Sequence, residues 1–114
     1  MSATVRVFYH AGLTTAAVAA GTRYATDSVS MLKQPYAARS SVTVDTGTPQ
    51  STSAAPNAAK IAYVQVQEGK AVHYEVNPPN RSTPADTGSP VLKGSTQIEI
   101  GPEWTISFLE HTVS

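Results

Sequence analysis

Apolar and polar residues alternate strictly in several short runs, and these runs are the strongest structural signal in the chain. A period of two places successive side chains on opposite faces of a strand, so each run predicts one buried face and one wet face. Trp104 alternates with Ile106 and Phe108, and we therefore expect it to anchor the core. The predicted strands are Thr4–Tyr9, Ser41–Asp45, Lys60–Gln67, Ala71–Val76, Thr96–Ile100 and Glu103–Leu109.

Glycine and proline mark the connections between these strands. Glu68-Gly69-Lys70 is the short glycine-containing link expected of a β-hairpin between the strands on either side of it. Gly101-Pro102 predicts a turn before the closing strand. Pro90-Val91-Leu92 predicts a brief edge strand, and Arg23–Leu32 an irregular segment with room for one short strand.

Three longer stretches have compositions that do not suit a core. Residues 46–57 (TGTPQSTSAAPN) and 77–90 (NPPNRSTPADTGSP) are rich in Ser, Thr and Pro, which predicts loops or extended arms. Residues 11–21 are alanine-rich and bracketed by glycines. Two interpretations stay open for this stretch: a short helix, or an extended arm that lies on a neighbour.

These elements predict an all-β fold. About six or seven short strands with regularly spaced turns suit a single small antiparallel β-sandwich or barrel. A chain of 114 residues has the size of one hydrophobic core, so we expect a single β domain over residues 1–114.

Charge and cysteine content weigh against several classes of function. Eight basic and eight acidic side chains cancel to a formal charge of zero, which argues against direct nucleic-acid binding and favours self-association. The chain has no cysteine, and hence no disulfide or Cys-based zinc site. It shows no secretory signal and no apolar run long enough to cross a bilayer, so we expect synthesis in the host cytoplasm and no membrane partner.

Residues that could support catalysis are scattered. The three histidines show no metal-binding spacing, and His73 falls on the polar face of its strand. Glu99, Glu103 and Asp86 could approach one another as a carboxylate pair, but nothing indicates a cleft, so solvated charges are favoured. No GxSxG or SxxK motif is present. We therefore expect no catalytic residue, no cofactor and no metal, in a protein that is not an enzyme.

Arginine and tyrosine are the residue types best suited to a binding surface. Together they suggest a stacking surface for single-stranded nucleic acid or sugar, whereas their scatter over the chain favours separate surface arginines. Both types are also enriched at protein interfaces. The residues concerned are Arg6, Arg23, Arg39, Arg81, Tyr9, Tyr24, Tyr36 and Tyr63.

Two stretches resemble small β-sandwich structural proteins of tailed bacteriophages. They are STSAAPNAAKIAYVQVQEGKAVHYEV (Ser51–Val76) and SPVLKGSTQIEIGPEWTISFLE (Ser89–Glu110). The pattern is a Ser/Ala/Pro lead-in, a strand, a P-x-L-x-G step and a closing strand after a glycine-containing turn. The pattern runs from Ser51 to Glu110, which is a little over half of the chain, and it carries no catalytic residue. Several proteins of this type are head decoration or cement proteins.

The resemblance implies a virion structural protein on the capsid exterior that binds and stabilises the head across neighbouring capsid subunits. Its implied partners are the major capsid protein and copies of itself, as a homodimer or homotrimer. A compact β core with long arms suits this role, because arms can pair with the sheet edges of neighbours. The expected interface residues are Val5, Phe8, Tyr9, Pro49, Pro56, Pro79 and Arg81.

Two other functions stay open. The first is a receptor- or carbohydrate-binding β-sandwich module that uses exposed side chains such as Tyr36 and Arg81. The second is a tail or connector component that is present at only a few copies per particle.

Overall fold

The computed structural model describes residues 3–17, 28–32 and 36–111, which form ten strands. Within these ranges there is no helix with the length and apolar character needed to span a membrane. The first sheet has the order β4 (Ala38–Val44), β1 (Ala3–His10), β6 (Ile61–Val66), β9 (Ser95–Glu99). The second sheet has the order β5 (Gln50–Ser51), β10 (Thr105–Glu110), β7 (Ala71–Asn77), β8 (Val91–Lys93).

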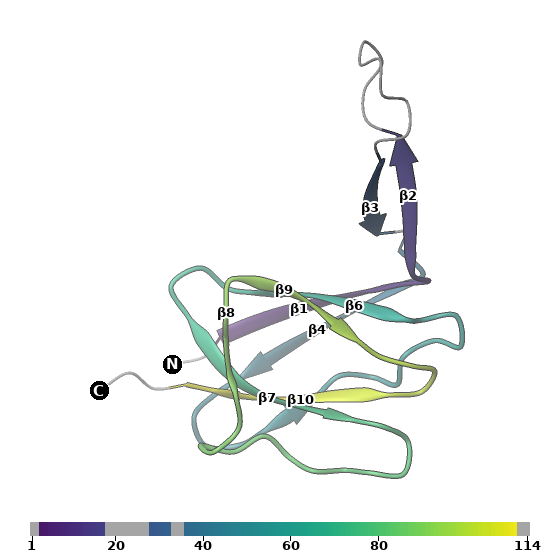
Figure 1. Ribbon diagram of the computed structural model, residues 1–114. Coiled ribbons are helices and arrows are strands. Elements are labelled where there is room, and N and C mark those ends of the chain that lie inside the picture. The colour runs from purple at the N-terminus through teal and green to yellow at the C-terminus, as the bar shows by residue number, and fades with distance from the viewer. Residues whose placement is uncertain (1–2, 18–27, 33–35, 112–114) are drawn as a thin grey trace.

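The two sheets are antiparallel throughout and face each other as the layers of a β-sandwich (Figure 1). This confirms the predicted all-β fold and selects the sandwich over the barrel. The sandwich contains eight strands rather than six or seven, because the two-residue strand β5 lies in a Ser/Thr-rich stretch without alternation.

The core lies between the inner faces of the sheets. Strand β1 turns Val5, Val7 and Tyr9 inward, and none of these is more than 2% exposed. Ile106 and Phe108 of β10 come from the opposite sheet and are equally buried. Each large apolar side chain buried in this way stabilises the fold by about 1.5–3 kcal/mol, so the predicted alternation is what holds the layers together. Trp104 is half-buried and packs against this core.

Strands β6 and β7 do not form the predicted hairpin. Strand β6 pairs with β1 and β9, whereas β7 pairs with β10 and β8, so the chain crosses from one sheet to the other. The link itself is a tight turn, in which the Lys70 N–H donates to the Gln67 carbonyl and Gly69 has a φ of 80°. The hairpin prediction was wrong because the same local turn chemistry serves an arch between two layers.

Two more tight connections also cross between the sheets. The brief edge strand predicted at Pro90–Leu92 is β8, and Gly94, with a φ of 77°, leads from it into β9 of the other sheet. The predicted turn at Gly101-Pro102 carries the chain back to β10. A Cβ atom on Gly101 would lie 2.9 Å from Nε1 of Trp104, so the indole packs directly on a glycine backbone.

The loops predicted at 46–57 and 77–90 fold back onto the sandwich instead of extending from it. In the first, Thr52 and Ala55 are buried, and Thr52 hydrogen-bonds to the main chain of Ile106. In the second, Ala85 and Ser89 are buried. The composition predicted loops or extended arms here, and the structure shows loops that pack on the sandwich. Hydroxyl and main-chain groups bury readily when each finds a hydrogen-bond partner.

The stretch 11–21 contains a strand rather than a helix. Strand β2 (Leu13–Ala17) pairs with β3 (Ser28–Leu32) in a separate two-stranded sheet, and residues 18–21 lie outside the described ranges. Gly12 precedes it with a φ of 138°, a conformation that favours glycine, and the chain leaves the first sheet at this point. Figure 1 shows this hairpin standing away from the two layers of the sandwich. Of the two open interpretations, the extended arm fits residues 13–17.

We expect Gly101→Ala to destabilise the protein by about 1–3 kcal/mol, because the new methyl group would displace the Trp104 indole. The free energy of unfolding in urea, followed by Trp104 fluorescence, measures this. Gly47→Ala is the matched control, since its Cβ would meet only Asp45 Oδ1 at an ordinary 3.7 Å, and its effect should stay within about 0.5 kcal/mol. Equal effects at the two glycines would contradict the close packing.

Asp45 should make stability depend on pH in the acid range. Its Oδ1 accepts the N–H groups of Thr48 and Gly47, each at 2.9 Å, and these bonds hold the pKa of Asp45 below its ordinary value of 3.8. A depressed folded-state pKa means that this stabilisation is complete above the ordinary value and is lost as pH falls toward the folded-state pKa.

Asp45→Asn keeps an acceptor oxygen but does not titrate. Its free energy of unfolding should therefore fall less steeply than that of the native protein from about pH 5 to about pH 2. Urea unfolding of both proteins over a pH series tests this expectation, and parallel pH profiles would be evidence against it.

Candidate functional site

The outer face of the second sheet carries a partly buried polar network under the 77–90 loop. Nδ1 of His73 hydrogen-bonds to the main-chain oxygen of Ser89 at 2.9 Å, and the Ser89 hydroxyl donates to Oε2 of Glu75 at 2.7 Å. Arg81 Nη2 donates to the other oxygen of Glu75 at 3.0 Å. Ser107 Oγ accepts the main-chain N–H of Ala85 at 2.9 Å. These contacts attach the loop to β7 and β10.

His73 lies on the face predicted from its strand, but it is only 5% exposed rather than wet. A carbonyl oxygen only accepts, so Nδ1 of His73 is the donor in this bond. Nδ1 of His111 lies 3.1 Å from Nε2 of His73, within hydrogen-bond distance. The pair therefore connects the end of β10 to the loop over β7.

The Ser89 hydroxyl donates to the Glu75 carboxylate, and His73 faces the Ser89 carbonyl instead of the hydroxyl. The network therefore lacks the serine–histidine contact of a Ser–His nucleophile pair. Glu99 and Glu103 are exposed. Throughout the described ranges, no group of three or more His, Cys, Asp or Glu side chains could hold a metal ion.

The outer face of the first sheet is open, and it presents a different chemistry. Its register aligns side chains across all four strands in two adjacent rungs. One rung is Arg39, Phe8, Tyr63 and Gln97, and the next is Ser41, Arg6, Gln65 and Ser95. We call these eight residues the outer platform. Strands about 4.8 Å apart make each rung roughly 14 Å wide.

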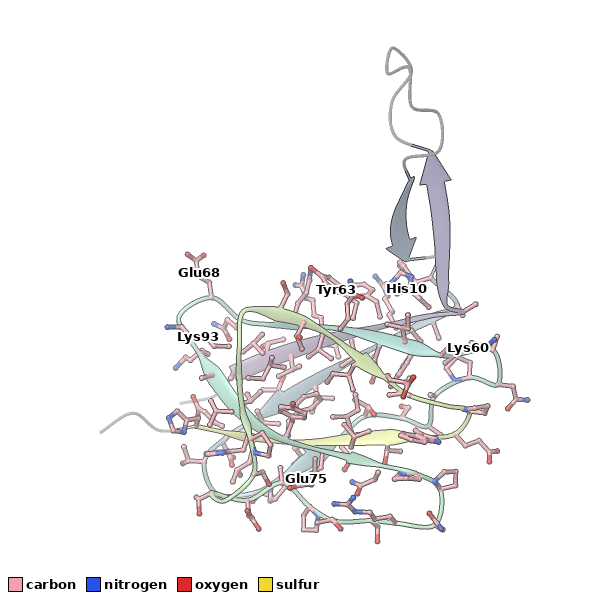
Figure 2. All side chains as sticks on the ribbon, in the orientation of Figure 1. His10, Lys60, Tyr63, Glu68, Glu75 and Lys93 are labelled. Atoms are coloured by element: carbon pink, nitrogen blue, oxygen red, sulfur yellow. The ribbon has the colours of Figure 1, made fainter. Side chains whose placement is uncertain are left out.

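Aromatic and polar groups on the outer platform are held by specific contacts. The ring of Tyr36 packs edge-on against Phe8, with centroids 5.1 Å apart. Hydrogen bonds to the Ser95 and Gln65 side chains lower the pKa of Tyr63 below its ordinary value. Figure 2 shows Tyr63 on the outward side of this sheet, far from Glu75 on the other side of the sandwich.

The two arginines of the outer platform carry unneutralised charge. Among the described residues neither Arg6 nor Arg39 forms an ion pair, and both are exposed. Two hollows of about 360 and 460 Å³ adjoin Arg6, and no acidic side chain lines either of them. Uncompensated arginine beside aromatic rings is a surface suited to an anionic partner.

The structure divides the predicted interface residues. Val5 and Tyr9 lie in the core, so their prediction as interface residues was wrong. The alternating pattern of β1 turns both side chains toward the opposite sheet of the same molecule. Phe8 is half-buried and faces outward on the platform. Arg81 is exposed but already occupied by Glu75 and by Thr83.

The three predicted prolines lie in the folded-back loops. Pro49 and Pro56 are half-buried and Pro79 is exposed. None of them lies on a segment that extends away from the sandwich, because both loops pack on it.

The arginines and tyrosines suggested as a stacking surface are also divided. Arg6, Arg39 and Tyr63 belong to the outer platform and Tyr36 packs beside it, while Tyr9 is in the core. Arg81 contacts the second sheet, so Arg81 and Tyr36 lie on opposite outer faces and cannot form one glycan site. The suggested residues at positions 23 and 24 lie outside the described ranges.

No protein-family model matches the chain, and neither curated proteins nor solved structures show a match.

Ser107→Ala should cost about 1–3 kcal/mol of stability, because it leaves the buried N–H of Ala85 without its acceptor. Faster hydrogen exchange at the Ala85 amide, together with a lower free energy of unfolding, would confirm this. Ser82→Ala, in an exposed part of the same loop, is the control and should leave both values unchanged. Unaltered protection of Ala85 in Ser107→Ala would show that the loop does not depend on this bond.

Proposed function

We propose that this protein is a virion structural protein, a capsid decoration or cement protein that binds the head exterior across neighbouring capsid subunits. Its partners in this proposal are the major capsid protein and further copies of itself. The protein acts by adding contacts between subunits and carries out no reaction.

The projecting β2–β3 hairpin is the observation that carries this proposal. Its strands pair only with each other and join neither layer of the sandwich. An isolated two-stranded hairpin is at best marginally stable in water. A hairpin that stands away from its own core is therefore best explained by a second surface on which it docks.

The sequence of the hairpin suits protein contact. Its strands, LTTAA and SVSML, contain no charged residue. Both strands keep one edge unpaired within the described structure, and an unpaired edge can add to the sheet of a neighbour through main-chain hydrogen bonds. Repeated on many equivalent subunits, such contacts would raise the cost of opening a shell.

Copy number separates this proposal from a tail or connector component. Particles from the source would be purified and banded by density, and the chain counted against the major capsid protein by quantitative mass spectrometry. A ratio near one copy per capsid subunit is expected for decoration. A few copies per particle would favour the tail or connector function, and absence from particles would overturn the virion proposal.

Disrupting the hairpin should abolish binding to particles that lack this protein. The double variant Thr15→Pro/Ala16→Pro replaces two adjacent residues of β2. In an antiparallel pair, every second residue donates its main-chain N–H to the partner strand, so one of the two prolines must remove an N–H that bonds to β3. Because the hairpin is separate from both layers, the thermal unfolding of the sandwich should not change.

Ser82→Pro, in the exposed part of the 77–90 loop, is the matched control and should bind like the native protein. Co-sedimentation with particles measures both variants. Full binding by a folded double-proline variant would exclude the hairpin as the attachment element.

A further inference from the structure

We propose that the outer platform of the first sheet is a binding site for an anionic oligosaccharide, independent of the hairpin. Arg6 and Arg39 would bind carboxylate or sulfate groups, the aromatic rings would pack against the faces of the sugars, and the amide and hydroxyl side chains would pair with sugar hydroxyls.

The charge of the outer platform indicates that its ligand is an anion. Arg6 and Arg39 lie on adjacent rungs of β1 and β4, and neither has an acidic partner among the described residues. The four strands carry one acidic residue at their outward positions, Glu99, which pairs with Ile61 at the β9 edge, beyond Tyr63. The platform is thus locally cationic in a protein whose formal charge is zero.

Hydrogen-bonding capacity identifies the class of ligand. Gln65, Gln97, Ser41 and Ser95 can each both donate and accept, as sugar hydroxyls do. Phe8 and Tyr63 are adjacent across β1 and β6 in the middle of this polar surface. Aromatic rings framed by amides and hydroxyls provide one apolar contact and several polar ones within the length of a short oligosaccharide.

The other anionic macromolecules fit the outer platform less well. A nucleic acid requires clustered basic residues along its backbone, and the platform has two. Arginine and aromatic side chains also occur at protein interfaces, but the centre of such an interface is largely apolar, and Phe8 and Tyr63 are the only apolar members of the two rungs. The hollows beside Arg6 are partly open to solvent, which suits a weakly bound, partly solvated chain.

The test uses the full chain, labelled with ¹⁵N, and follows its amide resonances during titration with tetragalacturonate. We expect shifts concentrated on β1, β4, β6 and β9, with binding that weakens as salt is added. Maltotetraose, which lacks the carboxylates, should bind at least tenfold more weakly. Shifts that are absent, or confined to other strands, would overturn the proposal.

Variants assign the interaction to the arginines. Arg6→Gln and Arg39→Gln should each lower the affinity for tetragalacturonate about tenfold, the loss expected for one charge-assisted hydrogen bond. Arg81→Gln, on the opposite face of the sandwich, removes the same charge and should bind like the native protein. An equal loss of affinity in all three variants would show that only the net charge of the protein matters, and it would overturn the proposed site.

Competing ligands complete the test. Octathymidylate and hexaglutamate would be titrated under the same conditions. Tighter binding of either one to the same residues would replace the saccharide as occupant and overturn this proposal. Because the hairpin is not involved, a negative result here leaves the attachment experiment on particles unaffected.

Discussion

The closure of one apolar sheet face on another is the constraint on which the rest of this molecule depends. Val5, Val7 and Tyr9 from one layer meet Ile106 and Phe108 from the other, and all five are almost fully buried. Because the alternating pattern places these residues inward, every intervening residue must point outward. The two outer faces are thus a direct result of the core, and they differ in what covers them. The 77–90 loop covers the second sheet, while the first sheet stays open.

Much of the fold could be predicted because alternation is a local property. The strands at β1, β6, β7 and β10 follow from a period of two. The polar stretch 77–90 is almost entirely loop, as predicted, whereas 46–57 also contains the short strand β5. The pairing of the strands could not be predicted in the same way. Gly69 allows a tight turn equally well within one sheet or between two sheets. Which of these forms depends on the partners of the flanking strands, and here β6 pairs with β1 while β7 pairs with β10.

The candidate site shows the same division between local and long-range information. That Arg6 and Phe8 point away from the core can be inferred from β1 alone. That Arg39 and Tyr63 stand on either side of Phe8 depends on β4 and β6 as neighbours, which no short pattern in the sequence specifies. The burial of polar side chains could not be predicted for a related reason. His73 is buried because it bonds to the carbonyl of Ser89, sixteen residues away in the sequence.

The path of the chain through the sandwich also determines how it can come apart. The connections β4–β5, β5–β6, β6–β7, β8–β9 and β9–β10 all pass from one layer to the other, so neither sheet is a continuous piece of polypeptide. One sheet cannot separate while the other stays folded, because each crossing connection joins a strand of one sheet to a strand of the other. Because the backbone crosses repeatedly between the two sheets, the sandwich should unfold under tension as one cooperative unit. The β2–β3 hairpin has no such crossings, so it should unfold or reorient independently.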